Sequence, residues 1–192
     1  DEDYINYRCE AFRVCLKNSI VIGCVKRVRD RFFVNHIINK FNVKEAECFP
    51  TDQHLMLLLF TKLRQNISLG SLYTNWIDLS ELNTKPYKEY KENDVYVVSF
   101  FYERDIRSKV LRIDVPFTFP PSENVDLVNS TISKVINILD YWTYPGQDPL
   151  PVLLAHEKCN IRKGAAEVLY EEILTKSRSV DPFDQLVASR MR

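Results

Sequence analysis

The chain has 192 residues, of which 45% are hydrophobic and 27% charged, the usage of an ordinary globular domain. Its 26 basic and 26 acidic residues cancel, so no global field favours nucleic acid or a membrane surface as a partner. No apolar run is long enough to span a bilayer, no secretory leader is recognisable, and the five cysteines lack the paired spacing of a disulfide framework or a zinc site. We therefore expect a single intracellular, cytoplasmic domain over residues 1–192, free-standing or part of a larger protein, with no metal and no cofactor.

The first 60 residues predict a turn followed by strands. Partial alternation of apolar residues favours strands over 19–25 and 31–39, after a turn that begins at residue 8. The basic run 26–31 is either a docking stripe for an acidic partner or a solvated strand edge, and we favour the solvated edge. Residues 54–60 form a continuous apolar run, which suits a buried helix or a central strand.

Farther along, the pattern predicts a hairpin and then a helix. Two β-rich runs, 94–102 and 108–119, are joined by a short charged segment, as in a hairpin. The tyrosine-containing segment 87–90 before them is predicted to be an exposed loop. Apolar residues recur at helical spacing over 125–139, which predicts a helix after the proline-rich break.

Near the C-terminal end, three segments in a row predict a strand, a tight loop and a helix. The strand is the apolar run 151–155, and the helix is the stretch of strong helix formers 165–174. A loop that leads from a strand into a helix N-terminus points backbone N–H groups at an anion. This layout is typical of a phosphate-binding loop.

Read with its neighbours, this region resembles the phosphate loop of the protein tyrosine phosphatases, in which a strand is followed by His-Cys, five residues, Arg, Ser or Thr, and Gly. On that pattern Ala155 takes the place of the His, His156 that of the nucleophilic Cys, Arg162 that of the phosphate-binding Arg, and Gly164 that of the Gly. The resemblance implies an α/β (α+β) fold with a central mixed, twisted β-sheet flanked by helices. It also implies that residues 54–60 are the central strand.

Other segments resemble the family in the same order along the chain. Residues 13–25 are similar to its Arg-Val…Asp-Tyr-Ile-Asn-Ala-Ser segment, residues 71–76 to its Cys-x-x-Tyr-Trp, and residues 179–192 to its Val-Asp-Val segment and the helix after it. Residues 110–118 resemble the strand that leads into the Trp-Pro-Asp loop. The resemblance covers almost the whole chain, with the flanking terminal segments of the family expected to be missing. The residues in place of Trp-Pro-Asp are Phe119, Pro120 and Pro121.

The sequence resembles the family in the order of its segments but lacks the family's catalytic residues. Attack on phosphorus needs a low-pKa cysteine thiolate, and His156 stands in that position. With Pro121 in place of the general acid, protonation of the leaving group is lost, typically a factor of about 10²–10⁴. Cys159 and Ile161 occupy the positions of two loop glycines, so we expect a different loop backbone. These three changes predict a catalytically inactive pseudophosphatase.

The candidate site is this degenerate phosphate loop, and the expected partner is another protein, with no nucleic acid and no membrane span. Lys158, Arg162 and Lys163 favour an anion such as a phosphorylated tyrosine or an acidic segment, whereas Glu157 opposes it. The loop comprises His156, Glu157, Lys158, Cys159, Asn160, Ile161 and Arg162.

Two alternatives stay open. One is an active phosphatase with His156 as an unorthodox nucleophile. The other is an E2-like or RWD interaction module, because residues 94–121 also resemble that family's strand pair and its proline-rich ending. A parallel strand over 151–155 would exclude the module, and a four-stranded antiparallel meander would support it.

Overall fold

The computed structural model describes residues 2–67, 70–82 and 84–159. The chain divides into two compact units, residues 1–152 and 153–192, and the fold described here is that of the first. This unit combines α-helices with an antiparallel five-stranded sheet, which confirms the predicted α+β class. All strand pairs among the described residues are antiparallel, so the sheet they form is not the mixed sheet implied by the phosphatase resemblance.

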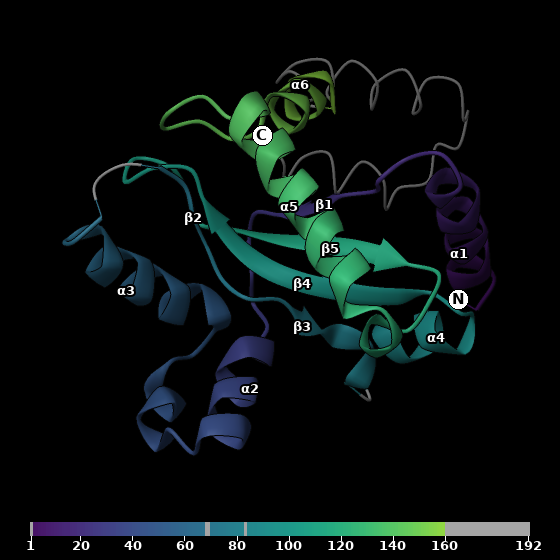
Figure 1. Ribbon diagram of the computed structural model, residues 1–192, viewed down its shortest axis with the longest axis horizontal. Coiled ribbons are helices and arrows are strands. Elements are labelled where there is room, and N and C mark those ends of the chain that lie inside the picture. The colour runs from purple at the N-terminus through teal and green to yellow at the C-terminus, as the bar shows by residue number, and fades with distance from the viewer. Residues whose placement is uncertain (1, 68–69, 83, 160–192) are drawn as a thin grey trace, which may run out of the picture. The chain divides into compact units, whose positions relative to one another are not determined.

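A long hairpin forms the centre of the sheet (Figure 1). It consists of β4 (Tyr96–Glu103) and β5 (Leu111–Phe117), which confirms the predicted hairpin. The short strand β1 (Gly23–Val25) pairs with the outer side of β5. On the other side, β2 (Leu72–Tyr73) and β3 (Ile77–Asp78) both pair with β4 and form the opposite edge.

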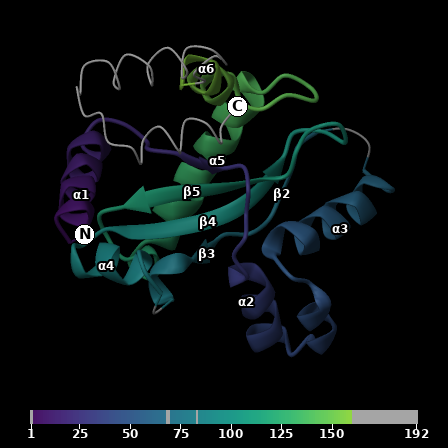
Figure 2. The same cartoon turned by 180° about the vertical axis from the view of Figure 1, so that it is seen from behind.

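Both faces of the hairpin are covered by helices. Successive side chains of a strand point to opposite faces. Val98 and Phe100 pack beneath α5 (Val125–Trp142), whereas Val97 and Phe101 join a second core on the opposite side. The two cores explain why β4 is apolar almost throughout, with no alternation of apolar and polar residues. Helix α5 crosses one face of the sheet. It lies in front of the strands in Figure 1 and behind them in Figure 2.

Helix α5 confirms the predicted helix 125–139 and extends it to Trp142. Its first turn is capped by Asn124, whose side-chain oxygen accepts a hydrogen bond from the backbone N–H of Leu127 at 3.1 Å. Its inner face follows the helical period. The residues buried on that face are Val128, Ile132, Val135, Ile136 and Leu139.

Four helices build the opposite core. The turn predicted from residue 8 is instead part of α1 (Glu2–Leu16), and the exposed loop predicted at 87–90 is the helix α4 (Tyr87–Glu92), in which Tyr87 and Tyr90 are buried. The strand predicted over 31–39 is α2 (Phe32–Phe41). Residues 54–60 lie in α3 (Asp52–Arg64), so the buried helix is the correct alternative for this apolar run and the central strand implied by the phosphatase resemblance is wrong. Short 3₁₀ turns complete the fold at Lys44–Cys48, Leu79–Glu81 and Pro121–Glu123.

Helical spacing, and not strand alternation, accounts for α2. Phe33 and Val34 are buried, and Ile37 and Ile38, four residues later, pack against the same core. The β-branched residues of this segment favour strands, but burial of one helical face outweighs that propensity. The helix ends at Asn42, which adopts a left-handed conformation with φ 55°.

The strand predicted over 151–155 is also wrong, because these residues lie in α6 (Leu150–Cys159). Pro151 is in the first turn, where a missing N–H costs nothing, and the leucines after it are strong helix formers. The helix predicted over 165–174 lies outside the described residues. None of the helices in the described ranges combines the length and the apolar character that a bilayer span requires.

Candidate functional site

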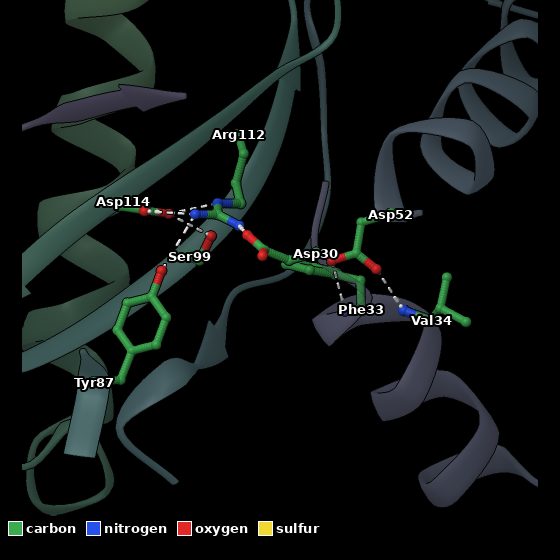
Figure 3. Close-up of polar contacts among 8 residues, drawn as sticks. All are labelled: Asp30, Phe33, Val34, Asp52, Tyr87, Ser99, Arg112 and Asp114. Atoms are coloured by element: carbon green, nitrogen blue, oxygen red, sulfur yellow. Dashed lines mark hydrogen bonds and ion pairs between the residues drawn. The ribbon is translucent and has the colours of Figure 1, made fainter. Parts of the chain in front are cut away.

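The most concentrated polar cluster in the described part of the chain surrounds Arg112 on β5 (Figure 3). Arg112 and Asp114 are two residues apart on one strand and therefore point to the same face. The guanidinium is 5% exposed and donates to both carboxylate oxygens of Asp114, from Nε at 3.0 Å and from Nη2 at 3.1 Å. It also donates from Nη1 to Asp30 at 2.8 Å and from Nη2 to the hydroxyl of Tyr87 at 3.2 Å. Ser99, directly opposite Asp114 on β4, donates to the same carboxylate at 2.8 Å.

Charge pairing keeps this arginine ionised despite its burial. Burial by itself lowers the pKa of Arg112, but Asp114, Tyr87 and Asp30 outweigh it and raise the pKa above the ordinary value. Burial, followed by the charge of Asp114, raises the pKa of Tyr87 to about 12. Tyr87 is therefore a neutral hydroxyl at physiological pH, and it accepts a hydrogen bond from the arginine.

A second buried carboxylate, Asp52, joins two helices beside this cluster (Figure 3). It stands in the first turn of α3, and its two oxygens accept from the backbone N–H groups of Phe33 at 3.0 Å and Val34 at 2.9 Å. Those groups lie in the first turn of α2, where N–H groups have no partner within the helix. Burial raises the pKa of Asp52, and the backbone hydrogen bonds from Val34 and Phe33 oppose that rise. Asp52 therefore caps α2 from a different helix.

The chemistry of this cluster is structural. Arg112 donates four hydrogen bonds to acceptors within the protein. The carboxylate oxygens of Asp52 and Asp114 already accept hydrogen bonds from other groups of the protein. A buried, fully paired arginine orients strands and loops, but it has little left to offer a substrate. The cluster holds three parts of the fold together. These are strand β5, the segment that precedes α2, and helix α4.

A cavity adjoins the cluster between α1, α4 and the β1 edge of the sheet. Its volume is about 470 Å³, and Arg112 and Asp114 form part of its wall. Arg8 of α1 stands at this wall with its guanidinium 5.5 Å from the ring centre of Phe12 and 5.6 Å from that of Tyr90. The hydroxyl of Tyr90 is buried and has no hydrogen-bond partner among the described residues. The cavity thus combines apolar walls with a small number of polar groups.

The predicted general-acid position belongs to an apolar turn. The strand predicted to lead into it is confirmed as β5, and the ring of Phe119 packs against that of Phe117 with centres 5.3 Å apart. Pro120 precedes the 3₁₀ turn and Pro121 is buried at its start. Phe119 packs against the core beneath α5, and none of the three side chains has a proton to donate.

The predicted phosphate loop differs from its expected conformation in the described part. His156, Glu157 and Lys158 are exposed on α6 instead of following a strand in a loop. In an α-helix the backbone N–H groups of such residues bond to carbonyls four residues earlier, so they cannot form an anion cradle. Cys159 ends the helix. The remaining predicted residues, Asn160, Ile161, Arg162 and Lys163, lie outside the described residues, as do Gly164 and the segment 179–192.

The basic run 26–31 is only partly a free surface. Lys26 pairs with Asp148 at 2.9 Å, and Arg31 donates to the carbonyl of Glu47 at 3.2 Å. Arg27 and Arg29 are exposed, and no ion pair is found for them within the described ranges. This arrangement agrees with the favoured reading of a solvated stretch beside a strand.

The sequence contained one indication of the Arg112 cluster. Arg112 and Asp114 interrupt an apolar strand at a spacing of two, which places opposite charges side by side on a buried face. The partners Asp30 and Tyr87 could not be found in this way because 82 and 25 residues separate them from the arginine.

No group of three or more His, Cys, Asp or Glu residues with metal-binding geometry occurs in the described ranges. Comparisons with protein-family models, with curated proteins and with solved structures give no match to this chain.

Proposed function

We propose that this chain is a non-catalytic protein-interaction domain that binds an acidic partner protein through the outer surface of α3. The observation that carries the proposal is a set of four exposed leucines on that helix. Leu57, Leu58, Leu59 and Leu63 are 55%, 45%, 39% and 45% exposed.

The helix is apolar on more sides than its own core requires. Leu55, Met56 and Phe60 already anchor it to the protein and are at most 5% exposed. A helix that is apolar all round is normally buried, and a contiguous exposed apolar surface on a soluble domain commonly marks an interaction site. The exposed leucines are therefore best explained by a partner that covers them.

The charges of α3 favour an acidic partner. Its one acidic residue, Asp52, is buried and caps α2. Lys62 is exposed next to Leu63, with no ion pair found for it within the described ranges, whereas Arg64 is buried in a 2.8 Å ion pair with Glu103. The exposed surface of the helix thus carries leucines and positive charge but no carboxylate, which suits an apolar surface with acidic residues at its rim.

The phosphatase resemblance supports the non-catalytic part of the proposal. His156 stands in the position of the nucleophile and Pro121 in that of the general acid, so we propose an inactive member of that class, a pseudophosphatase that acts as a scaffold. The helical conformation of residues 150–159 weakens the argument for a phosphate cradle, and we place the principal interface on α3. Anion binding by Arg162, Lys158 and Lys163 remains a secondary proposal.

An E2-like or RWD module is the second candidate, and it has the same general function. The antiparallel sheet and the proline turn after β5 favour it. The strand order β1-β5-β4-β2 argues against a simple meander, because β1 lies beside β5 and not beside β2.

The α3 surface is tested by placing a photo-crosslinking amino acid at position 58 to identify the partner, followed by binding of the purified partner. The double variant Leu58→Glu, Leu63→Glu is expected to lose binding while its circular dichroism and melting temperature stay close to those of the wild type. Ile106→Glu, at a 74% exposed isoleucine in the β4–β5 turn, is the matched control and should bind normally. Normal binding by the double variant would contradict the proposal.

The secondary proposal of anion binding is tested with matched phosphorylated and unphosphorylated tyrosine peptides, with Arg162→Ala as the control. Stronger binding of the phosphorylated peptide that is lost in Arg162→Ala would establish a working anion site. Equal binding of the two peptides would show that this region does not read phosphate. Turnover of an aryl phosphate that disappears in His156→Ala would overturn the non-catalytic proposal.

A further inference from the structure

The cavity between α1, α4 and the β1 edge has the size of a small-molecule site. Its volume of about 470 Å³ falls within the range of about 300–1,000 Å³ that such sites occupy. Its lining comes from five separate stretches of the first unit, α1, residues 21–25, α4, β4 and β5. The fold therefore holds the walls together over a long range of sequence.

The walls are mainly apolar and include flat rings. Phe12 of α1 and Tyr90 of α4 stand edge to face, with ring centres 6.0 Å apart. Aliphatic side chains from three strands complete the wall, namely Val25, Val97 and Pro116. Such walls favour a ligand with a flat apolar body.

The charged groups of the wall decide the charge of the ligand. Arg112 and Asp114 are bound to each other through two hydrogen bonds, so neither is available to a ligand. Arg8 is exposed; it contacts the rings of Phe12 and Tyr90, and no carboxylate partner is found for it within the described ranges. The charge left to meet a ligand is positive.

A buried polar group in the same wall is unsatisfied by the protein. Tyr90 is 3% exposed, and its hydroxyl has no partner in the described part of the chain. A buried hydroxyl without a hydrogen bond is costly, but this one has almost no accessible surface, so Tyr90 contributes its ring to the wall. Arg8 supplies the donors, and an anion supplies acceptors.

We propose that this cavity binds a small organic anion with a flat apolar body, whose carboxylate or equivalent acidic group pairs with Arg8 while its rings lie between Phe12, Tyr90 and the aliphatic wall. The site is separate from the α3 surface, and its occupancy does not depend on the interaction proposed there. The ligand is recognised by one charge and by shape, without a metal or a covalent step.

The test uses the full 192-residue chain and three probes of the same shape: 2-naphthoate, the neutral 2-naphthalenemethanol and the cationic 2-naphthylmethylamine. Binding is followed by amide chemical shifts. Saturable shifts at Cys24, Val25 and Tyr87 with 2-naphthoate, and weaker binding of the other two probes, are expected. Shifts confined to α3 or to other exposed apolar residues would overturn the proposal.

Two substitutions and a control separate the contribution of the Arg8 charge from that of the cavity walls. Arg8→Gln should weaken 2-naphthoate about tenfold or more, the usual effect of losing a charged hydrogen-bond partner, and should leave the neutral probe unchanged. Arg29→Gln removes an exposed arginine that does not line the cavity and should change neither. Val25→Trp, at a half-buried wall position, should block all three probes while the melting temperature shows that the chain stays folded. Equal affinity of 2-naphthoate for the wild type and Arg8→Gln would refute the role of Arg8.

Discussion

Arg112 is held by carboxylates on two different segments, and its removal leaves both without their cation. Because Asp114 is on the same strand and Asp30 precedes α2, the arginine connects a central strand to the start of the helical layer. Loss of one partner of a buried ion pair costs far more than the pair contributes, since a buried charge is left uncompensated.

We expect Arg112→Met to lower the free energy of unfolding by about 3–5 kcal/mol, as judged by urea denaturation. The matched control is Arg107→Met, because that side chain is 72% exposed and stands 4.0 Å from its partner Asp105. The control should change stability by less than about 0.5 kcal/mol. Similar stabilities of the two variants would show that the Arg112 pairs do not stabilise the fold.

Tyr87 gives a test that depends on pH. Its pKa is raised to about 12, chiefly by burial, so its neutral form is favoured in the folded state. The stability that this preference supplies is fully present below the ordinary tyrosine pKa of about 10 and is lost as the pH rises through about 12. Raising the pH over this interval should therefore destabilise the wild type more than Tyr87→Phe.

The ionisation itself is measured by the ultraviolet absorbance of tyrosinate. Tyr87→Phe should remove one tyrosine from the late part of the titration, where burial also delays Tyr102. Loss of an early step in Tyr87→Phe would mean that the hydroxyl is not buried as described.

At the scale of elements, the sequence predicted well where the pattern was long and local. The β4–β5 hairpin follows from two β-rich runs, and α5 follows from the helical spacing of apolar residues over 125–139. Segment 31–39 was predicted to be a strand from its partial alternation of apolar residues, and only the phosphatase resemblance implied a strand for 54–60, whose apolar run fits a helix or a strand. Their helical state depends on burial against the sheet, which a single sequence does not reveal.

The candidate sites show the same division. Opposite charges at 112 and 114 were visible on one strand, but Asp30, Tyr87 and Arg8 are brought together only by the tertiary fold. The apolar run predicted to be the strand before the phosphate loop fits a strand or a helix by its spacing. It is a helix because Leu153 and Leu154 are strong helix formers and Pro151 suits a first turn. Family order and spacing could not resolve that ambiguity.

The cap of α5 provides a prediction for a single element. Asn124→Ala removes the acceptor for the N–H of Leu127 and should lower stability by about 1 kcal/mol in thermal or urea unfolding. Asn124→Asp retains the acceptor and places a negative charge at the helix N-terminus, so it should be neutral or stabilising. An alanine variant as stable as the aspartate variant would contradict the capping role.

At the scale of the first unit, one sheet separates two cores. Phe100 faces the core beneath α5 and Phe101, its neighbour on β4, faces the helical core on the other side. When β4 unfolds, its side chains are withdrawn from both cores at once, because both sets belong to one backbone. We therefore expect the two layers to unfold in a single cooperative transition.

The prediction is tested from the far side of the sheet. Trp76, which packs against the α5 core and donates to Asn129 at 2.8 Å, becomes the sole tryptophan reporter when Trp142 is replaced by phenylalanine. Met56→Ala removes a side chain from the opposite core and should cost about 2–5 kcal/mol. Leu139→Ala, in the α5 core, should cost about the same.

Cooperative unfolding requires that both variants move the fluorescence midpoint of Trp76 to lower denaturant. Independent layers predict a different result, in which Leu139→Ala moves the midpoint and Met56→Ala leaves it unchanged while hydrogen exchange in α3 accelerates. The shared strand β4 makes the first result the expected one, because residues in alternate positions of its backbone supply side chains to both cores.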